Sequence, residues 1–146
     1  IAVRVSSGKT TGDHIDQESI SVKPGEKKID ILVKMVRDKS FHKVIVFAET
    51  KRGVSAVRKN LHNAGIRVDE IHGNKSQSYR LKALDSFRSG RIQVLVATDV
   101  AARGLDISAV THVINFQPPK DIDSYIHRIG RTGRAGMTGK AYTFVN

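Results

Sequence analysis

Residues 43–64 read KVIVFAETKRGVSAVRKNLHNA, and this stretch contains the unit from which the chain is built. Val44-Ile45-Val46-Phe47 is apolar on both faces, as expected of a central parallel strand that helices cover on each side. A short polar junction follows, and a helical pattern then extends over 52–64. Residues 92–97 repeat the apolar strand pattern, so we expect strands and helices to alternate.

The alternation continues along the chain from Ile15 onward. We expect strands at residues 19–22, 43–47, 67–71, 92–97, 111–115 and 141–145, and helices near 26–36, 52–64, 76–89 and 121–129. This order predicts an α/β fold, with a doubly wound, mostly parallel sheet and helices on both faces. Gly65 and Gly90 stand at positions where glycines end helices.

The length and residue usage limit the class of protein. With 146 residues the chain suits one domain, which we place at 15–146 after a polar linker at 1–14. The absence of cysteine excludes disulfides and thiolate metal sites, and the six histidines lack paired-ligand spacing, so we predict no metal site. We find no apolar run near the ~20 residues that span a bilayer, and expect a cytoplasmic setting without membrane contact.

The formal net charge of +11 indicates a polyanionic partner. Nucleic acid is the leading class, but an acidic membrane surface and solubility alone remain alternatives, because the cations are spread along the chain.

Three strand ends carry polar junctions, AETKR at 48–52, HGNKSQ at 72–77 and TDVAAR at 98–103. Open parallel sheets bind ligands beyond the carboxyl ends of their strands, where the next helices point their N-termini. Backbone amides, helix dipoles, hydroxyls and cations together suit phosphates. A row of three such junctions would follow a sugar-phosphate backbone.

Helix capping is the structural alternative at these junctions. We expect Asn74 to be an N-cap that forms a capping box with Gln77, while Gly73 would only permit a tight turn. Arg80 and Arg103 would then be solvated surface cations.

Residues 125–136, YIHRIGRTGRAG, place three arginines at a spacing of three with glycines between them. Outward guanidinium groups of this kind suit a terminal phosphate, as an arginine finger does, although a generic basic loop is the alternative. Gly8-Lys9-Thr10 looks like the end of a phosphate-binding loop, but the glycine required five positions earlier is Val3.

Residues 94–107, VLVATDVAARGLDI, resemble motif V of the DEAD-box RNA helicases, and residues 127–134, HRIGRTGR, resemble motif VI. Residues 44–50 are similar to motif IV, and residues 72–80 resemble the HGD and QxxR elements, with Asn74 where the family usually has aspartate. The likeness covers about 20–145 and implies the second, C-terminal RecA-like domain of an ATP-dependent RNA helicase.

The resemblance also implies roles for individual residues. Arg131 and Arg134 are expected to be catalytic and to reach the γ-phosphate of ATP. Phe47 matches an aromatic near these arginines, although a core role is equally open. The ATP-binding and interdomain residues are expected to be Arg103, Gly104, Asp106, His127 and Arg128. The RNA-binding residues are expected to be Thr50, Lys51, Gly73, Gln77, Arg80 and Thr98.

The implied cofactor is ATP with Mg²⁺, and the metal would be held mainly by an N-terminal RecA-like domain of the same chain. That domain and RNA, contacted without sequence preference, are the expected partners, and we expect the isolated domain to be an inactive monomer. A DNA-acting superfamily-2 helicase and a non-enzymatic RNA-binding module remain alternatives.

Overall fold

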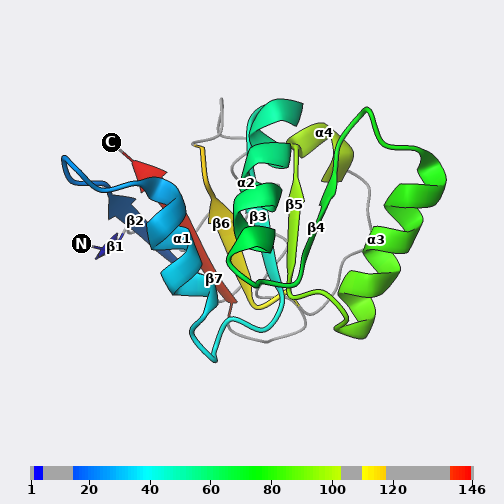
Figure 1. Ribbon diagram of the computed structural model, residues 1–146. Coiled ribbons are helices and arrows are strands. Elements are labelled where there is room, and N and C mark those ends of the chain that lie inside the picture. The colour runs from blue at the N-terminus through cyan, green and yellow to red at the C-terminus, as the bar shows by residue number, and fades with distance from the viewer. Residues whose placement is uncertain (1, 5–14, 103–109, 118–138, 146) are drawn as a thin grey trace.

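The computed structural model describes residues 2–4, 15–102, 110–117 and 139–145, which form one sheet and its helices (Figure 1). In chain order the elements are β1 (Ala2–Arg4), β2 (Ile15–Ser21), α1 (Lys28–Val36), β3 (Val44–Phe47), α2 (Lys51–Asn63), β4 (Val68–Ile71), α3 (Gln77–Ser89), β5 (Val94–Ala97), α4 (Asp99–Ala102), β6 (His112–Asn115) and β7 (Gly139–Val145).

The sheet has seven strands in the order β1-β2-β7-β6-β3-β5-β4. Strand β1 runs antiparallel to β2, and every other neighbouring pair is parallel. In the central register Val46 lies between Val96 and Ile114. The expectation of a mostly parallel sheet is therefore confirmed.

The predicted elements lie close to their expected positions, with two differences. Strand β2 begins at Ile15, earlier than the strand expected at 19–22, and β1 lies inside the segment expected to be a linker. The division into a linker and a domain stays a prediction, and the helix expected at 121–129 lies outside the described residues.

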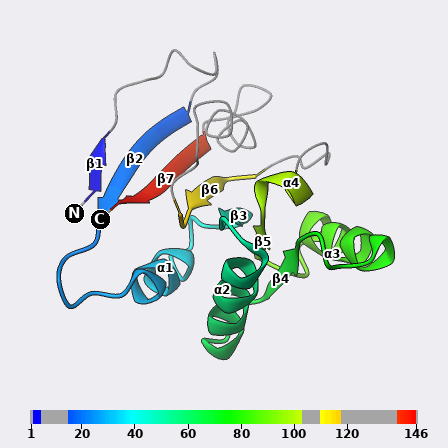
Figure 2. The ribbon, with the colours of Figure 1, turned by 90° about the horizontal axis from the view of Figure 1, so that it is seen from above.

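Two apolar clusters fill the two faces of the sheet. Helices α1 and α2 cover one face through residues such as Leu32, Val57 and Leu61, while α3 and α4 cover the other through Phe87 and Ala101. Figure 2 shows α1 and α2 on one side of the row of strands, and α3 and α4 on the other. Helices on both faces match the predicted doubly wound fold.

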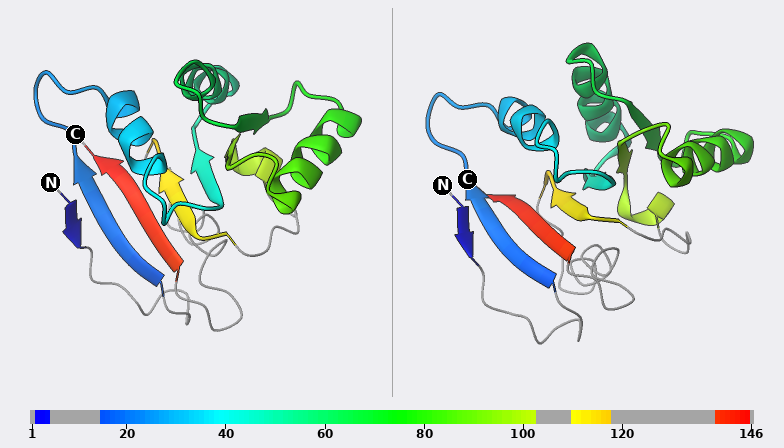
Figure 3. Two further views of the ribbon diagram at one scale, coloured as in Figure 1. Left: turned by 60° about the horizontal axis from the view of Figure 1, so that its bottom comes forward. Right: turned by 90° about the horizontal axis from the view of Figure 1, so that it is seen from below.

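The parallel strands give the domain two unlike ends. Helices α2, α3 and α4 begin just beyond the carboxyl ends of β3, β4 and β5, respectively. Helices α1, α2 and α3 finish at the opposite end, where the parallel strands begin, and Figure 3 views the sheet from that end. Gly90 is the C-cap of α3, with a φ of 85°, as its position in the sequence predicts. Within the described residues, no helix has the length and apolar character needed to cross a membrane.

Candidate nucleic-acid interface

The three predicted polar junctions lie side by side, because β3, β5 and β4 are adjacent parallel strands. We call this edge, made by residues 48–51, 72–77 and 98–99, the carboxyl-end rim. Helices α2, α3 and α4 start there, so the positive ends of their dipoles gather along one line.

Thr50 and Lys51 form the β3 part of the rim. Thr50 is the exposed N-cap of α2, and its Oγ1 accepts a hydrogen bond of 3.0 Å from the Gly53 amide. Lys51 Nζ donates to Asn74 Oδ1 at 3.0 Å and thereby links the β3 and β4 junctions.

Asn74 is not the N-cap of α3, so the expected cap and its capping box with Gln77 are wrong. Ser76 takes that position, and its Oγ accepts from the Tyr79 amide at 3.1 Å. Residues 72–75 form a turn before the helix, with Lys75 N donating to His72 O at 3.1 Å. Asn74 belongs to this turn, and its main-chain N–H donates to His72 Nδ1 at 3.2 Å.

Gly73 is exposed in the same turn, and a methyl group there would meet no other atom within 4 Å. Among the described glycines, positive φ angles occur at Gly25, Gly65 and Gly90 but not at Gly73. Neither the turn nor its packing therefore requires glycine at this position. Close approach of a ligand to the backbone would require it.

Arg80 joins α3 to α4 near the β5 part of the rim, and Thr98 precedes α4 there. Arg80 Nη2 donates to Ala101 O at 3.1 Å, and Thr98 Oγ1 accepts from the Ala101 amide at 3.3 Å. Arg80 is half-buried, and its Nε is buried without a partner among the described residues, so it is not a solvated surface cation. Gln77, the first residue of α3, is exposed beside them.

Four residues that sequence reasoning missed hold the β4 junction in place. Lys75 Nζ lies 3.2 Å from the buried Glu70 carboxylate and 4.5 Å from the centre of the Tyr79 ring. The Tyr79 hydroxyl donates to Asp69 Oδ1. Burial and this hydrogen bond raise the pKa of Tyr79, so its proton stays in place. The sequence signal for this cluster was the pair of acidic residues, Asp69 and Glu70, in the edge strand β4.

His72 is 5% exposed directly before Gly73. Burial lowers the pKa of its imidazole below the ordinary value, although the nearby Glu70 acts in the opposite direction. The neutral ring is the form that accepts the hydrogen bond from the Asn74 amide.

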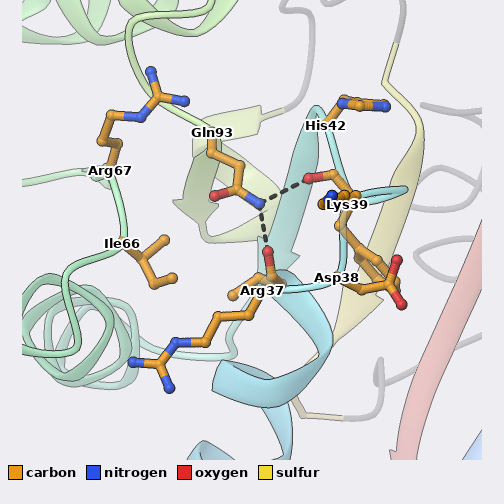
Figure 4. Close-up of a pocket in the computed structure, with 9 residues that line it drawn as sticks. Arg37, Asp38, Lys39, His42, Ile66, Arg67 and Gln93 are labelled. Atoms are coloured by element: carbon orange, nitrogen blue, oxygen red, sulfur yellow. Dashed lines mark hydrogen bonds between the residues drawn. The ribbon is translucent and has the colours of Figure 1, made fainter.

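A pocket of about 300 Å³ at the opposite end of the sheet is built differently (Figure 4). Gln93 Nε2 donates to Val36 O at 2.6 Å and to Phe41 O at 2.7 Å. Arg37 Nη2 donates to Ala64 O at 2.9 Å, and Arg67, also in its lining, donates through Nη1 to Gly90 O at 2.8 Å. These polar groups are bound to the main chain of the domain itself.

Phe47 is 2% exposed and belongs to the apolar cluster that includes Ile71 and Ala97, which favours its core role. The expected ATP-binding, interdomain and catalytic residues lie outside the described residues: Arg103, Gly104, Asp106, His127, Arg128, Arg131 and Arg134.

The sequence and fold have close counterparts among known proteins. Residues 27–136 match the family model for the helicase conserved C-terminal domain. The C-terminal domain of the DEAD-box protein Dbp5 has a TM-score of 0.82 and is 35% identical, with 93% of this chain and 79% of that one covered. The chain belongs to the DEAD-box family. It is a helicase C-terminal domain with the RecA-like fold that the family shares.

Other relatives agree with this assignment. The DEAD-box ATP-dependent RNA helicase CshA of Geobacillus kaustophilus is 50% identical over 143 residues, which are 98% of this chain and 30% of that protein. E. coli SrmB, in a structure with the regulator of ribonuclease activity A, is 39% identical, with a TM-score of 0.78 and 87% and 75% of the two chains covered. The chain thus spans about 30% of the length of the curated relatives it matches.

Proposed function

We propose that this domain is one half of an ATP-dependent RNA helicase, which closes on an N-terminal RecA-like domain over ATP and single-stranded RNA. Family membership supports the reaction class, and a relative supports the two ligands. Yeast Dbp5, 32% identical with a TM-score of 0.78 and 94% of this chain covered, has been solved bound to RNA and ADP BeF3.

The observation that carries the RNA part of the proposal is the continuous carboxyl-end rim. Thr50, Lys51, Gly73, Gln77 and Thr98 all lie on the rim, beyond three adjacent strand ends, and Arg80 of α3 reaches α4 beside it through its bond to Ala101 O. The open space over Gly73 suits a backbone that passes close to the chain. Contacts to phosphate and sugar make recognition independent of sequence and sensitive to salt.

The ATP part of the proposal rests on the donor set in the sequence. Arg131 and Arg134 are the proposed arginine fingers, and the guanidinium groups suit a terminal phosphate. Asp106 is proposed to accept from the ribose, with Arg103, Gly104, His127 and Arg128 at the interdomain cleft. ATP, with a Mg²⁺ ion held mainly by the N-terminal domain, would supply the phosphoanhydride bond whose hydrolysis drives the cycle.

Domain closure explains how the two ligands act together. Each ligand bridges both domains, so each strengthens the binding of the other through the shared closed state. The role of this half is to bring its arginines to the nucleotide and to hold the RNA backbone on a bent path that opens a few base pairs. We also propose that the protein acts in the cytoplasm. The isolated domain is proposed to be a monomer without ATPase activity, because it lacks its N-terminal partner.

Substitution of the proposed arginine fingers tests this assignment. In the full-length helicase, Arg131→Ala or Arg134→Ala should lower RNA-stimulated ATP hydrolysis by about 10³-fold, because charge developing on the transferred phosphate loses its partner. The same substitutions should leave RNA binding by the isolated domain nearly unchanged. Arg80→Ala should weaken that binding, and a filter-binding or anisotropy titration measures it.

A non-enzymatic RNA-binding module predicts another pattern. The two finger substitutions would then weaken RNA binding by the isolated domain as much as Arg80→Ala does, and the full-length protein would hydrolyse no ATP in response to RNA. That pair of results would refute the helicase assignment.

A further inference from the structure

Helix α2 is unusual in its charge. Its thirteen residues, KRGVSAVRKNLHN, contain four lysines and arginines and no acidic residue. By contrast, α1 contains Asp30 and α3 contains Asp85 among their basic residues. We call Lys51, Arg52, Arg58 and Lys59 the α2 stripe.

The spacing of these cations places them along two lines on the surface of the helix, about 100° apart. Arg58 follows Lys51 by seven residues and Lys59 follows Arg52 by seven, so each pair lies within about 20° of one line and about 10.5 Å apart along the axis. The core-facing residues Val54, Val57 and Leu61 occupy another face. Lys51, Arg52 and Lys59 are exposed, and Arg58 is half-buried.

The stripe runs from the carboxyl-end rim down α2, and two of its members, Lys51 and Arg58, lie towards the β4 junction and α3. At its upper end Lys51 donates to Asn74, which directly precedes α3 in the fold. Lower down, the charge of Arg58 acts on the Tyr79 hydroxyl of α3. Figure 2 shows α2 and α3 on the two sides of β4. The two carboxylates of β4 are engaged elsewhere, Asp69 by Tyr79 and Glu70 by Lys75.

Helix stability does not account for this arrangement. Lys51 and Arg52 occupy the first turn, which has no acidic residue, and the positive end of a helix dipole disfavours cations there. No acidic residue within α2 lies three or four positions away from Arg58 or Lys59 to form a stabilising pair. An external anion would complete these charges.

We propose that the α2 stripe binds the sugar-phosphate backbone of RNA that continues beyond the carboxyl-end rim. This inference rests on the proposed RNA helicase function and extends its RNA path along α2. At about 3.4 Å per nucleotide step of a stacked strand, the rise of about 10.5 Å from Lys51 to Arg58, or from Arg52 to Lys59, corresponds to about three further nucleotides. The binding energy would come from phosphates, without base recognition.

A length series of RNA separates the stripe from the rim. In the full-length helicase we compare wild type with the Arg58→Gln/Lys59→Gln variant on single-stranded RNAs of increasing length. Affinity for the shortest RNAs should be equal, and affinity for the longest should fall by roughly 10-fold in the variant. The slope of log affinity against log salt should become shallower by about 1.4 for long RNA, which is two single-strand phosphate contacts.

Lys27→Gln/Lys34→Gln is the matched control, because it removes two exposed cations at α1 and leaves α2 intact. Its length series and salt slope should equal those of wild type, and unfolding midpoints should show that all variants fold. If the stripe variant had the wild-type affinity and salt slope for long RNA, the inference would be overturned. That result is expected if the stripe binds an acidic protein instead of RNA. Arg80→Ala should lower affinity at every length, and its failure to do so would instead count against the proposed function.

Discussion

The two ends of the sheet use the same kinds of side chain in opposite electrostatic settings. At the end where the parallel strands begin, cations donate to carbonyls near the ends of helices: Arg37 to Ala64 at 2.9 Å, Lys43 to Arg88 at 2.8 Å and Arg67 to Gly90 at 2.8 Å. Cations favour the negative end of a helix dipole and satisfy its last carbonyls.

At the carboxyl-end rim the helices begin, and the dipole disfavours cations there. Lys51 binds only a neutral amide oxygen of Asn74 in the contacts described, and Arg80 keeps a buried Nε without a described partner. Basic residues at the first end complete the fold by satisfying helix carbonyls. At the rim Lys75 also completes the fold, through Glu70. By contrast, Lys51 and the Nε of Arg80 meet no acidic partner in the contacts described, which agrees with the proposed anionic ligand. Helix polarity separates the two groups.

The largest effect on stability is expected at Gln93, where one amide group satisfies two carbonyls. Gln93→Leu should lower the free energy of unfolding by about 2 kcal/mol, because Val36 O and Phe41 O lose their donor in a part-buried site. Denaturant unfolding of the domain measures the change, and RNA affinity should stay as in wild type.

Gln77→Leu is the matched substitution at the rim. Gln77 is exposed, so its replacement should leave stability within about 0.5 kcal/mol of wild type but weaken RNA binding. The contrast between the two ends would fail if Gln93→Leu weakened RNA binding and Gln77→Leu did not.

An effect of intermediate size is expected in how stability depends on pH, because each end of the sheet has a buried histidine. His112 begins β6, stacks on Phe41 with ring centres 3.7 Å apart, and is 4% exposed. Burial, aided by Lys140, lowers its pKa to about 4, whereas Asp38 acts against this shift. An unfolded histidine takes up a proton near pH 6.5, so the folded state loses stability as the pH falls from 6.5 towards 4.

His112→Phe keeps the stacked ring and removes this titration. Denaturant unfolding at a series of pH values should therefore show a shallower loss of stability below pH 6.5 in the variant, with up to one proton less taken up on unfolding. His72→Gln should flatten the profile in the same direction, since burial also lowers the pKa of His72. An unchanged profile in His112→Phe would contradict the neutral, buried assignment.

The fold and the location of the rim could be predicted because both depend on local patterns. Strands such as β3 and β5 are apolar on both faces, and this is legible within four residues. Parallel pairing then places the polar residues after them at one edge. The expected strand at 19–22 was too short because residues 15–18 carry no such apolar pattern.

The contacts within the rim were harder to predict, because they depend on partners far apart in the sequence. Lys51 and Asn74 are 23 positions apart, and Arg80 lies 21 positions from Ala101. Asn74 and Ser76 are both good helix caps two residues apart, and the turn at 72–75 decides between them. No local pattern contains that information.

The smallest effect on stability is expected at Gly73, and a comparison with Gly90 separates the two ends of the sheet. Gly73→Ala should leave the free energy of unfolding nearly unchanged, since a methyl group there meets nothing within 4 Å and φ is not positive. RNA affinity should nevertheless fall several-fold, because the added methyl group would hold the sugar-phosphate backbone of the RNA away from the turn at Gly73. Gly90→Ala should do the reverse and cost about 1 kcal/mol, since its φ of 85° disfavours a side chain. Denaturant unfolding and RNA titration of both variants measure these effects. Wild-type RNA affinity in Gly73→Ala would contradict the proposal that Gly73 serves RNA binding and Gly90 serves the fold.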